Sequence, residues 1–188
     1  RFTSGSFLED QDYWRLTGIT RDVMLWSAPK TQLRDFFFTS SLNSSYTSAE
    51  VNIDYAIEGG TGGTIEARLL DGSNVVGTAQ ADVTQLKSSL QMSVAAPKLW
   101  SAEEPNLYDL EMTLRNGGEV VYRPTTQVGF RQIAVRSDGA LTINGQRIVF
   151  HGVDRHVFST IGGRTMTREE IEKDIVTMKQ LNINAIRN

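Results

Sequence analysis

The sequence predicts a mainly β protein, built around an antiparallel β-sandwich of immunoglobulin-like size. Short apolar stretches of period two recur at regular spacing over residues 30–135, and Gly or Pro turn signals separate them. One amphipathic helix pattern follows, with a short apolar run on each side of it. The order strand, helix, strand is the repeating unit of a parallel α/β fold. We therefore expect the remnant of one sheet domain, a complete sandwich and the start of an α/β barrel.

The composition excludes several classes of protein. The chain has 188 residues, of which 39% are hydrophobic and 22% charged, as in ordinary globular proteins. Its net charge of −3 argues against a nucleic-acid partner. No apolar run approaches the roughly 20 residues of a membrane span, so we expect no membrane partner. The absence of cysteine excludes disulfides and thiolate metal sites, and it fits a reducing compartment such as the cytoplasm.

The first segment is too apolar to be a free tail. Residues 19–26 read as one strand, which we expect to be the last strand of an earlier sheet domain, because a lone strand cannot bury its faces. Before it, residues 8–14 hold three carboxylates and two aromatic rings. They form either a solvated acidic loop or a carboxylate beside an aromatic platform, as sugar sites often require. On the residues alone we favour the solvated loop.

The middle of the chain shows strand patterns throughout. Residues 51–57 alternate most clearly, and Asp71-Gly72 and Asn116-Gly117-Gly118 are hairpin turn signals. The glycine-rich residues 59–63 lack the Gly-Lys-Ser/Thr of a phosphate-binding loop, so we interpret them as a hairpin turn. The polar, aromatic-flanked loop 100–108 is interpreted as structural.

The last part predicts the beginning of a barrel. Asn144-Gly145 signals a hairpin, and residues 148–150 read as a strand that ends in the polar cluster Asp154, Arg155 and His156. Thr167 and Glu170 form a capping box, and apolar residues at helical spacing follow over 171–181. Residues 183–186 then enter another strand. In barrels of this kind, functional side chains follow the carboxyl ends of the strands.

His156 is the best candidate for a site residue on position alone. A buried, hydrogen-bonded imidazole is the alternative, and we favour that alternative for the other histidine, His151. No second histidine lies at zinc-ligand spacing, and no nucleophile elbow is present for a Ser-His-Asp triad. The carboxylates of the predicted helix, Glu169, Glu170, Glu172 and Asp174, belong to the outer layer of a barrel and are poor candidates for acid/base chemistry.

Five separated motifs resemble the large bacterial β-galactosidases of glycoside hydrolase family 2. They are residues 8–23, 97–101 with 105–108, 128–131, 144–156 and 178–187. The run Glu9-Asp10-Gln11-Asp12-Tyr13-Trp14 favours this branch over the related β-glucuronidases and β-mannosidases. One departure is that residues 157–161 replace the His-rich, Pro-containing run that often follows the Arg-His pair, which puts the individual sugar contacts in doubt.

The resemblance implies three parts: residues 1–27 as the end of a jelly-roll sugar-binding domain, 28–136 as the immunoglobulin-like sandwich, and 137–188 as the start of a (β/α)₈, or TIM, barrel. It implies that Asp12 contacts galactose hydroxyls and a sodium ion. It also implies that His156 contacts the sugar and that Arg187 is an active-site arginine. A magnesium ion in the whole enzyme would take its ligands from outside this chain.

The function implied is part of a retaining β-galactosidase that hydrolyses terminal β-galactosides such as lactose, and that assembles as a homo-oligomer. The two catalytic glutamates would lie beyond Asn188, so no residue here is assigned a catalytic role. We expect the segment alone to be inactive. The alternatives are a related β-glucuronidase, or a non-catalytic β-sandwich that serves as a binding or interaction module. The strand-helix-strand after Asp138 distinguishes them, because an adhesion module has no use for it.

Overall fold

The computed structural model describes residues 4–5 and 18–188. The chain forms two compact units. One contains residues 26–149, and the other combines residues up to 25 with residues 150–188. Within the described residues, no helix has both the length and the apolar character needed to cross a bilayer.

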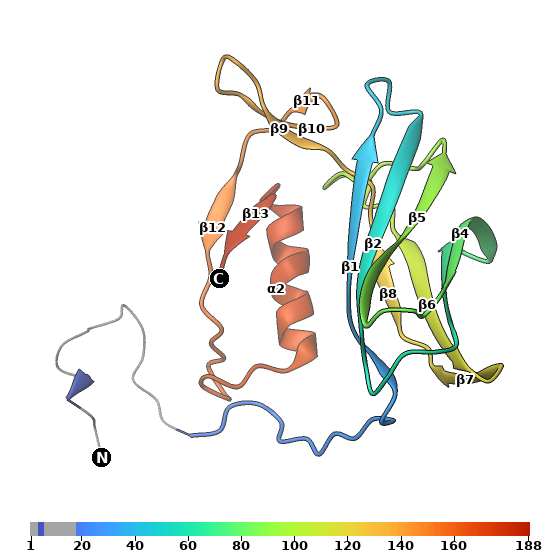
Figure 1. The fold of residues 1–188 in the computed structure, drawn as a ribbon. Helices are drawn as coiled ribbons and strands as arrows, with labels where there is room; N and C mark the ends of the chain where they lie inside the picture. Colours follow the sequence, from blue (N-terminus) through green and yellow to red (C-terminus); the bar gives the residue numbers. More distant parts are fainter. Residues whose placement is uncertain (1–3, 6–17) are drawn as a thin grey trace. The chain divides into compact units, whose positions relative to one another are not determined.

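The larger unit is the predicted antiparallel β-sandwich (Figure 1). Its first sheet has the strand order β1-β2-β5, and its second sheet has the order β4-β3-β6-β7, with β8 pairing the other half of β6. The first sheet consists of β1 (Gln32–Leu42), β2 (Ser48–Glu58) and β5 (Lys87–Ala95). The second consists of β3 (Thr64–Asp71), β4 (Asn74–Asp82), β6 (Tyr108–Asn116), β7 (Glu119–Tyr122) and β8 (Thr125–Val128).

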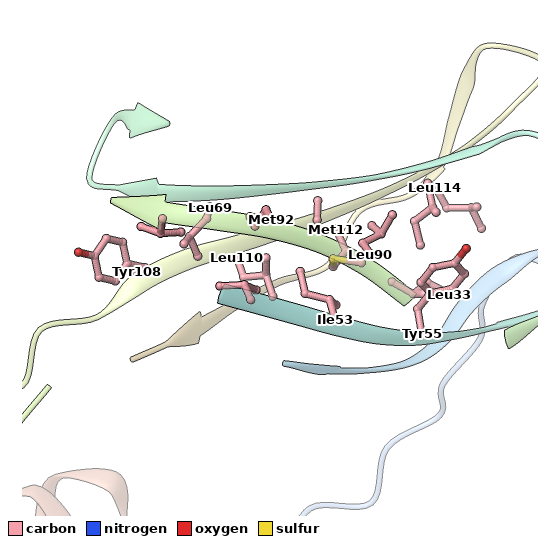
Figure 2. Packing of buried hydrophobic residues seen from close by; sticks show 14 of the residues in the cluster. Leu33, Ile53, Tyr55, Leu69, Leu90, Met92, Tyr108, Leu110, Met112 and Leu114 are labelled. Carbon is pink, nitrogen blue, oxygen red and sulfur yellow. The ribbon is translucent and has the colours of Figure 1, made fainter. Parts of the chain in front are cut away.

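The core lies between the two sheets and follows the alternation of the sequence. In β2, every second residue from Ala49 to Ile57 is buried. Figure 2 shows Ile53 of β2 and Leu110 and Met112 of β6 in this interior, and all three are fully buried. Phe130 is also fully buried, and it packs edge-to-face on Phe38 and Tyr108 at centroid distances of 5.9 and 5.1 Å. Removal of this apolar surface from water is the main stabilising term of the sandwich.

The glycine-rich residues 59–63 are not the hairpin turn that we predicted. They connect β2 to β3, which belong to different sheets. Gly62 N donates to Val83 O at 2.8 Å, and Val83 N donates to Gly63 O at 3.0 Å, so the crossing is tied to the segment after β4. Gly63 has a φ of +78°, and a Cβ added there would fall on the carbonyl oxygen of Arg115, far inside van der Waals contact. Glycine is required at position 63 because the backbone there lies directly against the backbone of Arg115.

The predicted strand at residues 19–26 is also absent. Residues 18–31 form only bends and irregular backbone up to the start of β1, and Val23, Met24 and Leu25 are exposed. The physical reason is that a strand needs a hydrogen-bonding neighbour, and none pairs with this segment among the described residues.

A small sheet of order β11-β10-β9 ends the larger unit. Its strands are β9 (Ile133–Val135), β10 (Leu141–Ile143) and β11 (Gln146–Arg147). The predicted Asn144-Gly145 hairpin joins β10 to β11, and both turn residues have positive φ, at 50° and 77°. This is the geometry that a two-residue turn of type I′ requires.

The smaller unit contains a parallel pair of strands and a helix: β12 (Gly152–Asp154), α2 (Arg168–Gln180) and β13 (Ala185–Arg187). The helix begins as predicted, with Thr167 as N-cap and Glu170 completing the capping box. Asn182, at φ 58°, follows the C-cap Leu181 in the left-handed conformation and ends the helix. The strand predicted at 148–150 is wrong in position, because the backbone that pairs with β13 starts at Gly152.

Replacing Phe130 by Ala should destabilise the sandwich by about 3–5 kcal/mol, because the lost ring leaves a cavity among Phe38, Tyr108 and the surrounding core. The matched control is Phe37→Ala, since the Phe37 side chain is 66% exposed and its loss should cost less than about 1 kcal/mol. Urea unfolding followed by circular dichroism measures both. Equal losses at the two positions would contradict the core assignment.

Gly63→Ala should destabilise the sandwich by about 1–3 kcal/mol more than Gly62→Ala, because only at Gly63 does the new methyl group overlap another backbone. Gly62 also has a positive φ, 110°, but a Cβ there meets nothing within 4 Å. The comparison therefore separates steric overlap from backbone strain. The measurement is again the free energy of unfolding in urea, and similar values for the two variants would refute the close approach.

Candidate functional site

The candidate site is built at the carboxyl ends of β12 and β13. The two strands pair in parallel, with Gly152 beside Ala185 and Asp154 beside Arg187. Asn184 joins the two segments just before the strands begin. Its side-chain Oδ1 accepts the His151 N–H at 2.8 Å, and its own N–H donates to His151 O at 3.1 Å. His151 is therefore a strand-entry residue with an exposed side chain, and the expectation that it is buried is wrong.

The register brings Asp154 and Arg187 together. Arg187 Nη1 lies 3.5 Å from Asp154 Oδ1, and both side chains are largely exposed. The carboxylate orients the guanidinium at the strand end, although water screens most of the attraction between such exposed groups. This arrangement leaves the remaining N–H donors of Arg187 available to acceptors outside the pair.

His156 lies just after β12 and is exposed. It lines a hollow of about 320 Å³, whose other lining residues are Thr20, Arg21, Arg155, Val157, Arg164 and Asn188. Arg21 also donates from Nη1 to Arg164 O at 3.3 Å, so the segment near residue 20 contacts the loop after His156. The structure thus brings His156 to a hollow, but Arg187 is not among the residues that line it. Asp12 lies outside the described residues.

Arg155 lines the same hollow, and its guanidinium is bound by helix α2. Its side chain reaches helix α2, where Nε and Nη2 donate to Asp174 Oδ2 at 3.1 and 2.7 Å. The side chain is only 12% exposed, and Nη2 also lies 3.3 Å from Met166 Sδ. Position in the sequence groups Arg155 with Asp154 and His156, and it places Asp174 in the outer layer of a barrel. No local signal announces this pair, because its members lie on different elements.

The loop after His156 is anchored to the beginning of α2. Ser159 Oγ donates to Glu170 Oε1 at 2.6 Å and accepts the N–H groups of Ile161 and Gly162 at 3.2 and 3.0 Å. Glu170 Oε2 accepts the Thr167 N–H at 2.8 Å. The Ser159 hydroxyl, and after it the Thr167 amide, hold the pKa of Glu170 below its ordinary value, so this carboxylate stays ionised and keeps both bonds.

Several residues of the resembling motifs lie in the sandwich unit and stabilise its loops. Asn144 Nδ2 donates to Trp100 O at 3.0 Å, and its Oδ1 accepts the Gln132 N–H at 2.9 Å. The Arg131 guanidinium lies 4.7 Å from the Trp100 ring centroid. Gly129 lies close beside that ring, since a Cβ there would be 3.1 Å from Trp100 Cβ, a tight contact. These contacts agree with the structural interpretation of loop 100–108.

Residues 4–5 and 18–188 contain no group of three or more His, Cys, Asp or Glu side chains placed to hold a metal ion. The sodium ion expected at Asp12 and the magnesium ion expected elsewhere stay predictions from the resemblance, and no chemical step is derived through them.

Two family models match the chain. Glycosyl hydrolases family 2 matches residues 31–131, and the TIM barrel domain of the same family matches residues 133–188. The second match includes the small sheet β9–β11, which packs with the sandwich in the structure. The predicted boundaries at 27/28 and 136/137 stay predictions.

Curated relatives match over nearly the whole chain. A β-galactosidase of Priestia megaterium is 40% identical over 201 residues, which cover 100% of this chain and 19% of the relative. A β-galactosidase of Streptococcus thermophilus is 39% identical over 191 residues, which cover 100% of this chain and 18% of the relative. The chain thus spans about a fifth of the length of these proteins.

Solved structures agree on the fold. A β-glucuronidase of Bacteroides uniformis superposes with a TM-score of 0.75 at 25% identity, covering 85% of this chain and 20% of that chain. A glycosyl hydrolase family 2 member from Bacteroides cellulosilyticus gives a TM-score of 0.76 at 23% identity, covering 85% of this chain and 24% of that chain.

The predicted succession of an immunoglobulin-like sandwich and the start of a TIM barrel is confirmed by the two family matches together with the strand order. The chain belongs to the glycosyl hydrolases family 2, of which it carries a sandwich domain and the first part of the barrel domain.

Proposed function

We propose that the full-length protein containing this segment is a retaining β-galactosidase, which hydrolyses terminal β-D-galactosides such as lactose. The observation that carries the proposal is the match of the whole segment to curated β-galactosidases at 36–40% identity. The match includes the stretches that hold Asp12, His156 and Arg187. The exposed cluster after β12 and β13 supports the proposal, because barrel enzymes bind substrate at this edge.

The reaction of a retaining glycosidase needs two carboxyl groups. One protonates the glycosidic oxygen as the bond to the anomeric carbon breaks, and the other attacks that carbon to form a glycosyl-enzyme. Water, deprotonated by the first group, then releases the sugar with its original configuration. We assign both carboxylates to glutamates beyond Asn188. The helix carboxylates here hold Ser159, Arg155 or helix neighbours.

Residues of this segment would bind the sugar. A guanidinium and an imidazole donate hydrogen bonds to hydroxyl oxygens, and a carboxylate accepts from hydroxyl groups. In the proposed enzyme, Arg187 and His156 supply donors and Asp12 supplies the acceptor. Contacts that strengthen as charge develops on the sugar ring accelerate the chemical step, whereas contacts made equally throughout only lower KM.

The first test is the substrate. The full-length enzyme should release nitrophenol from nitrophenyl β-galactoside, and nitrophenyl β-glucuronide should be a poor substrate. Proton NMR of the reaction should show β-galactose before its mutarotation. Preference for the glucuronide, or initial formation of α-galactose, would overturn the assignment of a retaining β-galactosidase.

His156→Ala should lower kcat/KM for nitrophenyl β-galactoside by roughly 10²-fold, because a hydrogen-bond donor to the transition state is lost. His151→Ala is the matched control. It removes the other histidine, whose hydrogen bonds to Asn184 are made by its backbone, and it should leave kcat/KM nearly unchanged. Steady-state kinetics of the two full-length variants measure the difference. Equal effects at both positions would exclude His156 as a specific sugar contact.

A further inference from the structure

We infer that Asp174, on the outer helix α2, is a positioning residue for the candidate site. It holds the Arg155 guanidinium, and through Arg155 it fixes the strand ends that carry His156 and Arg187. This inference rests on the proposed function for its kinetic consequence, although the hold itself is a property of the fold. Asp174 has no contact with substrate in this account, and its effect is transmitted entirely through Arg155.

The backbone of Arg155 connects the ends of the two strands that carry His156 and Arg187. Its N–H donates to the carbonyl oxygen of Arg187 at 2.9 Å, directly after the last ladder pair, Asp154 with Arg187. The next residue along the chain is His156. A displacement of the Arg155 backbone would therefore move both predicted sugar contacts. β12 and β13 have three residues each, so within the described residues few other ladder bonds resist such a displacement.

The side chain of Arg155 restrains the ends of β12 and β13 further, because it is bound to Asp174 on helix α2. Arg155 directly follows Asp154, the last residue of β12, and its side chain reaches helix α2. There it makes two hydrogen bonds to one carboxylate oxygen of Asp174. Helix α2 is itself anchored, since Glu170 bonds to Ser159 and to the Thr167 N–H. The strand ends are thus tied to a helix with a fixed beginning.

The burial of Arg155 distinguishes its ion pair with Asp174 from the Arg168–Glu172 pair on the same helix. The Arg168 and Glu172 side chains form an i,i+4 pair at 2.7 Å, but they are 86% and 57% exposed. Such a pair contributes little, because water screens it. The Arg155 side chain is 12% exposed and the Asp174 side chain is 46% exposed, so loss of this carboxylate would leave a mostly buried guanidinium without its counter-ion. The guanidinium then turns towards water, and the Arg155 backbone loses the side-chain restraint that Asp174 supplied.

Hydrogen exchange of the full-length protein tests the hold without reference to activity. Asp174→Asn keeps the size of the side chain and removes its charge. Amide exchange in peptides covering 153–157 and 185–188 should become several-fold faster in this variant. The matched control, Glu172→Gln, removes a carboxylate two residues away that pairs with exposed Arg168, and it should leave those peptides unchanged. Unchanged exchange in Asp174→Asn would overturn the inference.

Kinetics test the consequence for the site. Asp174→Asn should lower kcat/KM for nitrophenyl β-galactoside by roughly 10- to 100-fold, mainly through kcat, as small misplacements of contacts do. Glu172→Gln should stay within twofold of the wild type. In a His156→Ala background, the fold-effect of Asp174→Asn on kcat/KM should shrink by about threefold or more, because the His156 side chain that Asp174 helps to position is already absent. A fully additive effect would overturn transmission through His156.

The two arms separate the inference from the proposed function. A wild-type protein that exchanges as expected but hydrolyses no galactoside refutes the galactosidase assignment, while the exchange result still decides whether Asp174 holds the strand ends. If the wild-type protein is active and Asp174→Asn changes neither amide exchange nor kcat/KM, only the role of Asp174 is refuted.

Discussion

The parallel pairing of β12 with β13 is the constraint on which the candidate site depends. Three residues of each strand form the ladder, and that register sets Asp154 beside Arg187. Parallel strands need a crossover, here helix α2, so the same pairing brings a helix carboxylate within reach of Arg155. Side chains separated along the chain by a loop and a helix thus share one edge, where a barrel enzyme binds its substrate.

The sandwich depends on a different interaction, the apolar contact between two sheets, and the motifs typical of the family serve it. Tyr108 and Phe130 pack on one another, the Tyr108 hydroxyl accepts the Lys98 N–H at 2.7 Å, and Asn106 donates to Leu99 O at 2.9 Å. These residues belong to the resembling motifs, and their contacts stabilise the sandwich. A motif can therefore be specific for a family because a fold requires it, while the reaction is performed elsewhere.

Local patterns predicted much of the fold. The alternation in β2, the Asn144-Gly145 turn and the capping box of Thr167 with Glu170 all agree with the structure, because each depends on residues within a few positions. The failures have a common cause. Residues 59–63 join two sheets instead of forming one hairpin, and the barrel strand covers Gly152–Asp154 instead of residues 148–150. Both depend on which distant strand is the partner, and local periodicity carries no such information.

The sequence by itself determined the class of the protein, the succession of sandwich and barrel, and the residues typical of the family, since period, turn chemistry and motif order are local properties. His156 and Arg187 as sugar contacts stay predictions that come from resemblance. Only the tertiary structure decided that Arg155 faces Asp174, that Ser159 holds Glu170, and that His156 shares a hollow with Arg21. The physical reason is that a side chain's partner is set by strand register and by the face of a helix, which exist only once distant segments have packed together.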